Sequence, residues 1–349
     1  MSKIHLSKMH LPLLFFLLIF ASVYSLPFKC SAASPMKSAV AAPLDYTVPA
    51  TLLTTDSTIQ PASVLESSAL RPIQIRQADP PVFFVTDREL AKSTSSIKFN
   101  NNRSSEMTFG KYVADPSAAH FSKENLSLIH SERQFLQGLK AAGATNIAVL
   151  VHGYNESFND SIDDGMQMAK HLHAPLVVFS WPSKDNACSY IQDECAGEWS
   201  SHHLSSLLAD LGQNFGFSKI TLIAHSMGAR VVTWSLKDLY AAENRPVEKF
   251  AAALFIAPDM DKGVFIHNTP FLKQACSTCR VFVDSHDSHL LLSKILHGSD
   301  RVNFGEKGES VGMISQFFDY DGSLPSHDFI PYATLFASMH DFAAPGKTN

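Results

Sequence analysis

The feature that most constrains the fold is a regular alternation of short apolar segments with longer segments of helical periodicity. Strands that alternate with helices of this length predict βαβ units and a mostly parallel sheet. The strands are apolar on both faces, which is typical of a sheet covered by helices on both sides. Between the first two strands, the polar stretch 93–106 is expected to be a loop. The expected strands are 81–86, 109–114, 146–152, 174–181, 219–225, 250–257 and 280–284, and the expected helices are 131–142, 157–173, 200–215, 227–242, 264–274 and 289–296.

One of these strands runs directly into a helix with a serine at the corner, in the sequence Ala224-His225-Ser226-Met227-Gly228. In so tight a turn the positions two before and two after the serine must be small, as Ala224 and Gly228 are. The strained turn exposes the serine hydroxyl, and the N-terminus of the helix directs backbone N–H groups at a developing oxyanion. The pattern is that of a nucleophile elbow, with Ala in place of the more usual Gly at its first small position. It predicts that Ser226 is a nucleophile.

An earlier strand ends in His152-Gly153-Tyr154. The loop after this strand is where enzymes with a nucleophile elbow place the second N–H donor of the oxyanion hole. Gly153 allows the backbone to approach a substrate closely. We therefore expect the backbone N–H groups of Tyr154 and Met227 to form the oxyanion hole.

A serine hydroxyl needs a general base, and the base needs an acid that orients it. In enzymes of this kind the acid follows the serine along the chain and the histidine comes last. His327 is favoured by position, because it lies in an expected loop, whereas His340 lies in an expected terminal helix. The candidate acids are Asp259, Asp261, Asp284 and Asp287, and the candidate bases are His289, His297, His327 and His340.

From about residue 81 to 342 the chain resembles bacterial α/β-hydrolases of an uncharacterised esterase/lipase group, a family of unknown function. The resemblance implies an α/β-hydrolase fold with Ser226 as nucleophile, Asp287 as acid and His327 as base, and a structural or pocket role for Asp259. The sequence departs from the family pattern at Ala229 and after His327. The matching motifs are Phe83-Phe84-Val85-Thr86-Asp87-Arg88, His152-Gly153-Tyr154-Asn155, Phe179-Ser180-Trp181-Pro182-Ser183, Ser189-Tyr190, Asp193, Glu198-Trp199-Ser200, the Ser226 motif and Ala257-Pro258-Asp259.

Together these features predict a serine hydrolase that cleaves carboxylic esters through an acyl-enzyme intermediate. The alternative is a catalytically silent binding or envelope-associated protein on the same fold. A zinc hydrolase is a third reading, which activity in the presence of a strong chelator would exclude. The expected substrate is a small-molecule or lipid ester, and the sequence leaves the acyl chain length and the oligomeric state open.

The N-terminus has the pattern of an export signal. Lys3 and Lys8 precede an almost uninterrupted apolar segment, 11–26, and small residues suited to cleavage follow it. We expect a signal peptide at 1–33, a low-complexity tether or irregular extension at 34–80 and the α/β-hydrolase domain at 81–349. The protein is then periplasmic or secreted and has no stable membrane span, or it is membrane-anchored if the signal is not cleaved.

Four cysteines lie beyond the signal: Cys188, Cys195, Cys276 and Cys279. An even number in an exported protein predicts disulfides, and the short separations favour pairing within each half, although three pairings are possible. A zinc site and a redox-active Cys-x-x-Cys are the alternatives. The unequal spacing of the two pairs argues against zinc.

The remaining composition excludes some classes of function. A net charge of −5 provides no basic surface for phosphates, so we expect no nucleic-acid partner. No cofactor motif and no metal-binding pattern is apparent, and we interpret the paired histidines, such as His202 and His203, as solvated or locally hydrogen-bonded.

Overall fold

The fold is seen in a computed structural model, which describes residues 81–91, 97–113, 122, 125–172, 175–242, 245–283, 287–302, 317–319 and 327. The predicted signal peptide and tether lie outside these residues. So do Asp284 and His340, two of the alternative candidates for the acid and the base.

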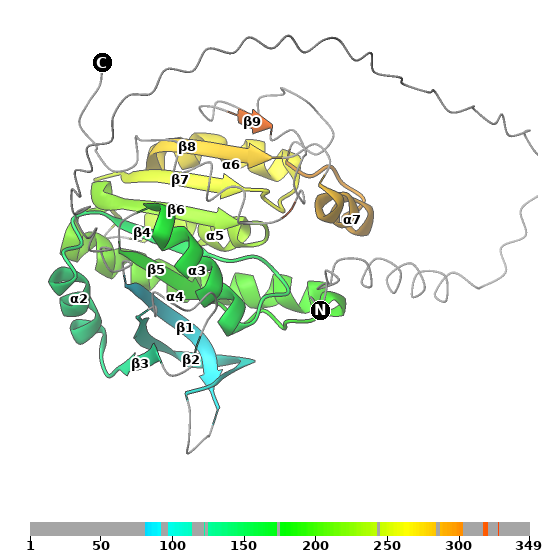
Figure 1. The fold of residues 1–349 in the computed structure, drawn as a ribbon. Helices are drawn as coiled ribbons and strands as arrows, with labels where there is room; N and C mark the ends of the chain where they lie inside the picture. The colour runs from blue at the N-terminus through cyan, green and yellow to red at the C-terminus, as the bar shows by residue number, and fades with distance from the viewer. Residues whose placement is uncertain are drawn as a thin grey trace, which may run out of the picture. The chain divides into compact units, whose positions relative to one another are not determined.

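Nine strands of the described residues form one sheet in the order β3-β2-β1-β5-β4-β6-β7-β8-β9 (Figure 1). In this sheet order, every pair of neighbours in the series β1-β5-β4-β6-β7-β8-β9 is parallel. Strand β2 pairs antiparallel with both β1 and β3. The strands are β1 (Val82–Leu90), β2 (Phe99–Tyr112), β3 (Leu126–Ile129), β4 (Ile147–Val151), β5 (Leu176–Ser180), β6 (Ile220–His225), β7 (Phe250–Ile256), β8 (Cys276–Val283) and β9 (Phe317–Asp319).

Helices cover both faces of this sheet. One buried apolar cluster joins the sheet to α2, α4, α5 and α6, and a second cluster on the other face joins it to α3 through Phe158, Ile162 and Met166. The helices are α2 (Glu132–Ala141), α3 (Phe158–Leu172), α4 (Tyr190–Phe215), α5 (Gly228–Ala241), α6 (Lys262–Ala275) and α7 (Ser288–His297), with short 3₁₀ turns η2 (Ala187–Ser189) and η3 (Phe217–Lys219). The predicted α/β fold, a mostly parallel sheet between helices, is confirmed.

The prediction of a loop at 93–106 was wrong, because β2 begins at Phe99 and runs through most of that stretch. Its polar residues face solvent while the strand pairs with β1, for example through Arg88 and Arg103. Helix α4 also begins ten residues earlier than predicted, at Tyr190. Its first turns bury polar residues such as Asp193 and therefore lack an apolar stripe. The short strands β3 and β9 were not predicted.

Two features of the described residues bear on the cellular expectations. None of their helices is both long enough and apolar enough to cross a membrane. No disulfide joins the four cysteines beyond the predicted signal, of which Cys188 and Cys195 are exposed and Cys276 and Cys279 buried, so neither of the disulfides favoured by spacing is present.

Candidate active site

Ser226 lies directly after β6, at the turn into α5, with a positive φ of 50°. This left-handed conformation is rare for a residue with a side chain and is retained only where the surroundings enforce it. The Ser226 N–H donates to the carbonyl of Ile256 at 2.9 Å, and the Ser226 carbonyl accepts from the N–H of Asp259 at 3.0 Å. The end of β7 therefore holds the strained turn in place.

The glycines around Ser226 allow two loops to press against it. A Cβ on Gly228 would lie 2.4 Å from the carbonyl oxygen of Val151 and 2.6 Å from that of His152. A Cβ on Gly153 would lie 3.1 Å from the Cβ of Ser226. The predicted need for a small residue at position 228 thus has a direct steric cause, namely the backbone at the end of β4.

The structure brings Ser226, His327 and Asp287 together, although more than 100 residues separate the first two. His327 Nε2 lies 3.1 Å from Ser226 Oγ, and His327 Nδ1 lies 2.6 Å from Asp287 Oδ2. The other carboxylate oxygen of Asp287 caps helix α7 and accepts the N–H groups of His289 at 2.9 Å and Leu290 at 3.0 Å. The carboxylate is thus fixed by the helix on one side and faces the imidazole on the other.

The surroundings of Asp287 favour its ionised form. Burial alone raises the pKa of this carboxyl, but the facing His327 imidazole and the N–H of Leu290 outweigh burial, so its pKa lies below the ordinary value. A buried carboxylate that stays ionised beside an imidazole can stabilise the positive charge that the imidazole acquires when it takes up a proton.

The other candidate acids and bases have different partners. The buried carboxylate of Asp259 accepts hydrogen bonds from Tyr190 and Ser293. Asp261 caps α6 through the N–H of Val264 at 2.8 Å, and His297 Nε2 lies 2.8 Å from Glu194 Oε1. None of these contacts involves Ser226, so the geometry favours Asp287 and His327.

The two predicted oxyanion donors lie in the turns that meet at Ser226. Met227 follows the serine at the start of α5. On either side of Tyr154 the backbone is tied down, because the Gly153 N–H donates to Glu156 Oε1 at 3.0 Å and the Asn155 N–H donates to Asp193 Oδ2 at 3.2 Å. These bonds hold the loop that carries the Tyr154 N–H rigid, which is what an oxyanion hole requires.

Sequence reasoning missed two residues, Glu156 and His225, that connect the loop carrying Tyr154 to His327. His225 Nε2 lies 3.2 Å from the carbonyl oxygen of His327, and His225 Nδ1 lies 3.6 Å from Glu156 Oε1. Burial raises the pKa of Glu156, but His225, His152 and the Gly153 N–H outweigh burial and lower it overall. Glu156 is therefore an anion that contacts both the loop carrying Tyr154 and His225, whose ring in turn contacts the His327 carbonyl.

His289, one of the four candidate bases, contacts His327 instead of Ser226. Its ring stacks on that of His327, with the ring centroids 4.5 Å apart and the planes inclined by 26°. Desolvation, followed by the neighbouring His327, lowers the pKa of His289 to about 4. It is thus neutral near pH 7. The sequence offered only its order along the chain as a signal.

Arg88, the last residue of the Phe83–Arg88 motif, is buried beneath the loop that carries Tyr154 and Glu156. Its guanidinium donates to the carbonyl of Glu156 at 2.9 Å, to Ser180 Oγ at 3.1 Å and to the carbonyl of Ser183 at 3.0 Å. Burial lowers the pKa of Arg88 to about 10, which leaves it charged near pH 7. The motif thus supplies a cation that ties β1 to the ends of β4 and β5.

A nearly parallel sheet between two helical layers, with a strained serine at the end of a central strand, defines an α/β-hydrolase. Residues 129–307, just over half of the chain, match the family described as alpha/beta hydrolase of unknown function (DUF900). The protein belongs to this family. No curated protein matches the chain.

Several solved structures are similar to the chain at low identity. An esterase/lipase from an uncultured bacterium is 14% identical, with 68% of this chain and 82% of that chain covered and a TM-score of 0.36. A hyperthermophilic esterase from the archaeon Pyrobaculum calidifontis is 11% identical, with coverages of 67% and 79% and a TM-score of 0.34. A lipase/esterase from Lactobacillus plantarum is 11% identical, with coverages of 70% and 97% and a TM-score of 0.34.

Proposed function

We propose that the protein is a serine hydrolase that cleaves carboxylic esters, with Ser226 as nucleophile, His327 as general base and acid, and Asp287 as the orienting carboxylate. The observation that carries the proposal is the continuous contact from Asp287 Oδ2 through the His327 imidazole to Ser226 Oγ, at 2.6 and 3.1 Å. Each of these distances allows a hydrogen bond in the direction that proton transfer needs.

In the proposed reaction Ser226 Oγ attacks the carbonyl carbon of the ester while His327 Nε2 takes the hydroxyl proton. The negative charge that forms on the carbonyl oxygen is stabilised by the N–H groups of Tyr154 and Met227. Collapse of the intermediate breaks the bond to the alcohol, which leaves with the proton from His327. Throughout this step the carboxylate of Asp287 stabilises the imidazolium.

A water molecule completes the cycle. His327 removes a proton from the water as it attacks the acyl-enzyme, and the same proton returns to Ser226 Oγ when the carboxylic acid leaves. The atoms balance as one ester and one water giving one acid and one alcohol. No metal or cofactor takes part in the proposed steps.

The decisive experiment is covalent labelling of the full chain by a fluorophosphonate, followed by intact-mass measurement and peptide mapping. We expect a single adduct on Ser226 that is absent in Ser226→Ala. The matched control is Ser206→Ala, which removes a serine on the exposed face of α4 and should leave labelling unchanged. A folded protein that gives no adduct would contradict the proposal and favour the silent binding protein.

The choice of ester over other acyl compounds needs a second measurement. Rates with matched p-nitrophenyl esters, thioesters and anilides of one acyl group separate esterase, thioesterase and amidase activity. We expect the highest kcat/KM for the esters. A thioester preference would leave the roles of Ser226, His327 and Asp287 intact and correct only the substrate class.

We also propose that the hydrolase acts outside the cytoplasm, in the periplasm or the medium. The support is the sequence pattern of Lys3 and Lys8 followed by the apolar segment 11–26. Sequencing the N-terminus of the protein recovered from its native host tests this. A start close to residue 34 supports cleavage and export, whereas an intact Met1 on membrane-bound protein would support the anchor.

A further inference from the structure

Asp287, His289 and His327 form a cluster of potential metal ligands. Each offers one ligand atom, and the three atoms lie within 4.8 Å of one another. Among the described residues no other group of three histidine, cysteine or acidic side chains is so close. Two imidazole nitrogens and one carboxylate oxygen are a donor set that zinc favours, with water as a fourth ligand.

The carboxylate of this cluster is already fixed in position. Asp287 Oδ1 accepts the N–H groups of His289 and Leu290 at the start of α7, which leaves Oδ2 directed at His327 Nδ1, 2.6 Å away. Such hydrogen bonds from outside the ligand set orient a metal ligand and raise the affinity of its site. Two of the three ligand atoms therefore face each other in a supported arrangement.

The third ligand has to move furthest, because Oδ2 and Nδ1, now 2.6 Å apart, need only separate by less than about 1 Å. His289 is exposed and stacks on His327, so its ring can turn toward Oδ2 and Nδ1 without disturbing the apolar core. Ligand atoms about 2 Å from a tetrahedral zinc ion are about 3.3 Å apart, so the His289 nitrogen must approach by less than about 2 Å. Rotation of an exposed side chain covers that distance.

We propose that Zn²⁺ binds between Asp287 Oδ2, His327 Nδ1 and the His289 imidazole and reversibly inhibits the enzyme. The inhibition rests on the function proposed above, whereas the zinc site does not. Zinc binds the lone pair of Nδ1, so the proton of the neutral imidazole lies on Nε2, and Asp287 Oδ2 becomes a zinc ligand instead of the acceptor of an Nδ1–H. With its proton on Nε2, His327 has no lone pair there to accept the Ser226 proton, so it cannot act as the general base while zinc is bound.

Zinc binding is measured first, because it needs no substrate. The full chain carries Cys188→Ser and Cys195→Ser, since exposed thiols also bind zinc. Competition with a chromogenic chelating dye should give one zinc per chain, with affinity at least about tenfold lower in His289→Ala. The matched control is His202→Ala, which removes another exposed imidazole beside a carboxylate, that of Asp238, and should bind zinc as the parent does.

Inhibition is measured as the ratio of Ser226 labelling rates with and without ZnCl₂ in the same variant, so that a changed basal rate cancels. In the parent we expect a fall of at least about tenfold that EDTA reverses, and in His289→Ala a change below about twofold. Mg²⁺, which prefers oxygen ligands, should have no effect.

The outcomes separate this proposal from the proposed function. Equal zinc affinity in the parent and His289→Ala overturns the zinc site, whether or not Ser226 is labelled. A zinc site lost in His289→Ala, in a protein that is never labelled, upholds the site and overturns the esterase. Labelling that EDTA abolishes would overturn inhibition, because the metal would then be required.

Discussion

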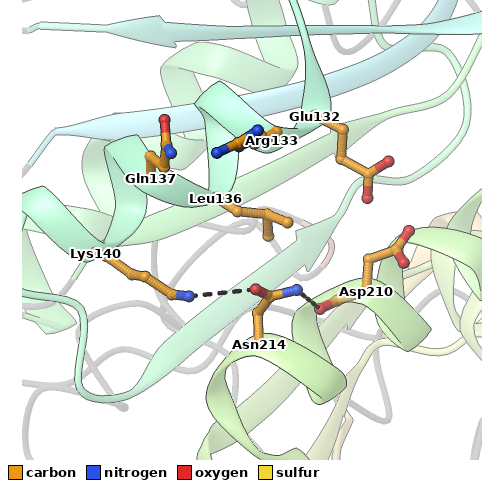
Figure 2. Close-up of a pocket in the computed structure, with 7 residues that line it drawn as sticks. All are labelled: Glu132, Arg133, Leu136, Gln137, Lys140, Asp210 and Asn214. Carbon is orange, nitrogen blue, oxygen red and sulfur yellow. Dashed lines mark hydrogen bonds between the residues drawn. The ribbon is translucent and has the colours of Figure 1, made fainter.

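Two carboxyl groups in this molecule show opposite shifts in pKa. Asp287 faces the His327 imidazole at the start of α7, and its pKa is lowered. Glu132 lies in a groove of about 400 Å³ between α2 and α4, and its hydrogen bond to Asp210, followed by burial, raises its pKa to about 7. In Figure 2 the carboxyl groups of Glu132 and Asp210 lie on facing sides of this groove. The ammonium group of Lys140 donates instead to Asn214 Oδ1 at 3.2 Å.

The difference shows that the facing group, more than the degree of burial, sets the charge of these carboxyl groups. Asp287 is fully buried, which by itself would neutralise it, yet an imidazole and a helix N-terminus keep it ionised. Glu132 is only half-buried, yet a second carboxyl group favours its protonated form. The ionised Asp287 beside His327 suits the stabilisation of positive charge in a transition state. The Glu132–Asp210 pair stores a proton, for which no acceptor is evident.

The largest expected effect comes from removing the charge of Asp287. Asp287→Asn should lower kcat by about 10³- to 10⁴-fold, because the neutral amide no longer stabilises the His327 imidazolium. The Ser226 labelling rate and kcat with a p-nitrophenyl ester measure this.

The matched control for this variant is Asp261→Asn. Both aspartates cap a helix, and Asn caps about as well, but Asp261 faces the start of α6, Ser299 and Arg301 instead of His327. Its kcat should change by less than about twofold. Equal losses in the two variants would mean that helix capping, rather than the charge facing His327, is what matters.

Glu156 allows the comparison to be tested on a third carboxylate. Like Asp287 it lies beside imidazoles, with its pKa lowered, but it is only partly buried and contacts His225 instead of His327. Glu156→Gln should lower kcat by about tenfold with KM nearly unchanged, because His225 and the loop carrying Tyr154 lose a shared support. Glu156→Asp, which keeps the charge, should recover part of the loss.

A KM increase without a kcat loss would instead assign Glu156 to substrate binding. A kcat that stays unchanged in both variants would show that the His225 contact to the His327 carbonyl is enough to position His327 without Glu156.

The sequence predicted the parts of the site that follow local rules. Apolar runs identified the central strands, and the small residues around Ser226 identified the turn, because both are set within a few positions of the chain. The order of the candidates and the family resemblance then selected Asp287 and His327. In the structure His327 contacts both Asp287 and Ser226.

Other parts depend on contacts between distant segments, which the sequence does not display. Glu156 and His225 meet only because β4 and β6 are adjacent in the sheet. The polar strand β2 was mistaken for a loop, because its side chains face solvent at one side of the sheet. The stacking of His289 on His327 likewise joins two residues that lie far apart along the chain.

The opposite pKa shifts predict opposite effects of pH on stability. A lowered pKa in the folded state means that the contribution of Asp287 is present above the ordinary pKa of about 3.9 and is lost as pH falls through the folded value. Asp287→Asn should therefore be about 1 kcal/mol less stable than the parent at pH 7, with the gap closing toward pH 3. Urea unfolding followed by circular dichroism measures it, and a gap that is constant with pH would contradict the ionic origin.

The smallest effect is expected at Glu132, with the sign reversed. Its raised pKa means that the stabilising contribution is complete below the ordinary pKa of about 4.3 and is lost as pH rises through about 7. Glu132→Gln stays neutral at every pH and can still donate to Asp210, so it should raise Tm at pH 8 by about 1–3 °C, a modest gain because the pair is only half-buried and solvent screens it. At pH 4 the variant and the parent should melt together.

Glu198→Gln, on the exposed face of α4, removes the same charge away from Asp210 and should leave Tm unchanged at both pH values. If that control gains as much at pH 8, the effect is one of net charge, and the carboxyl pair in the groove does not store a proton.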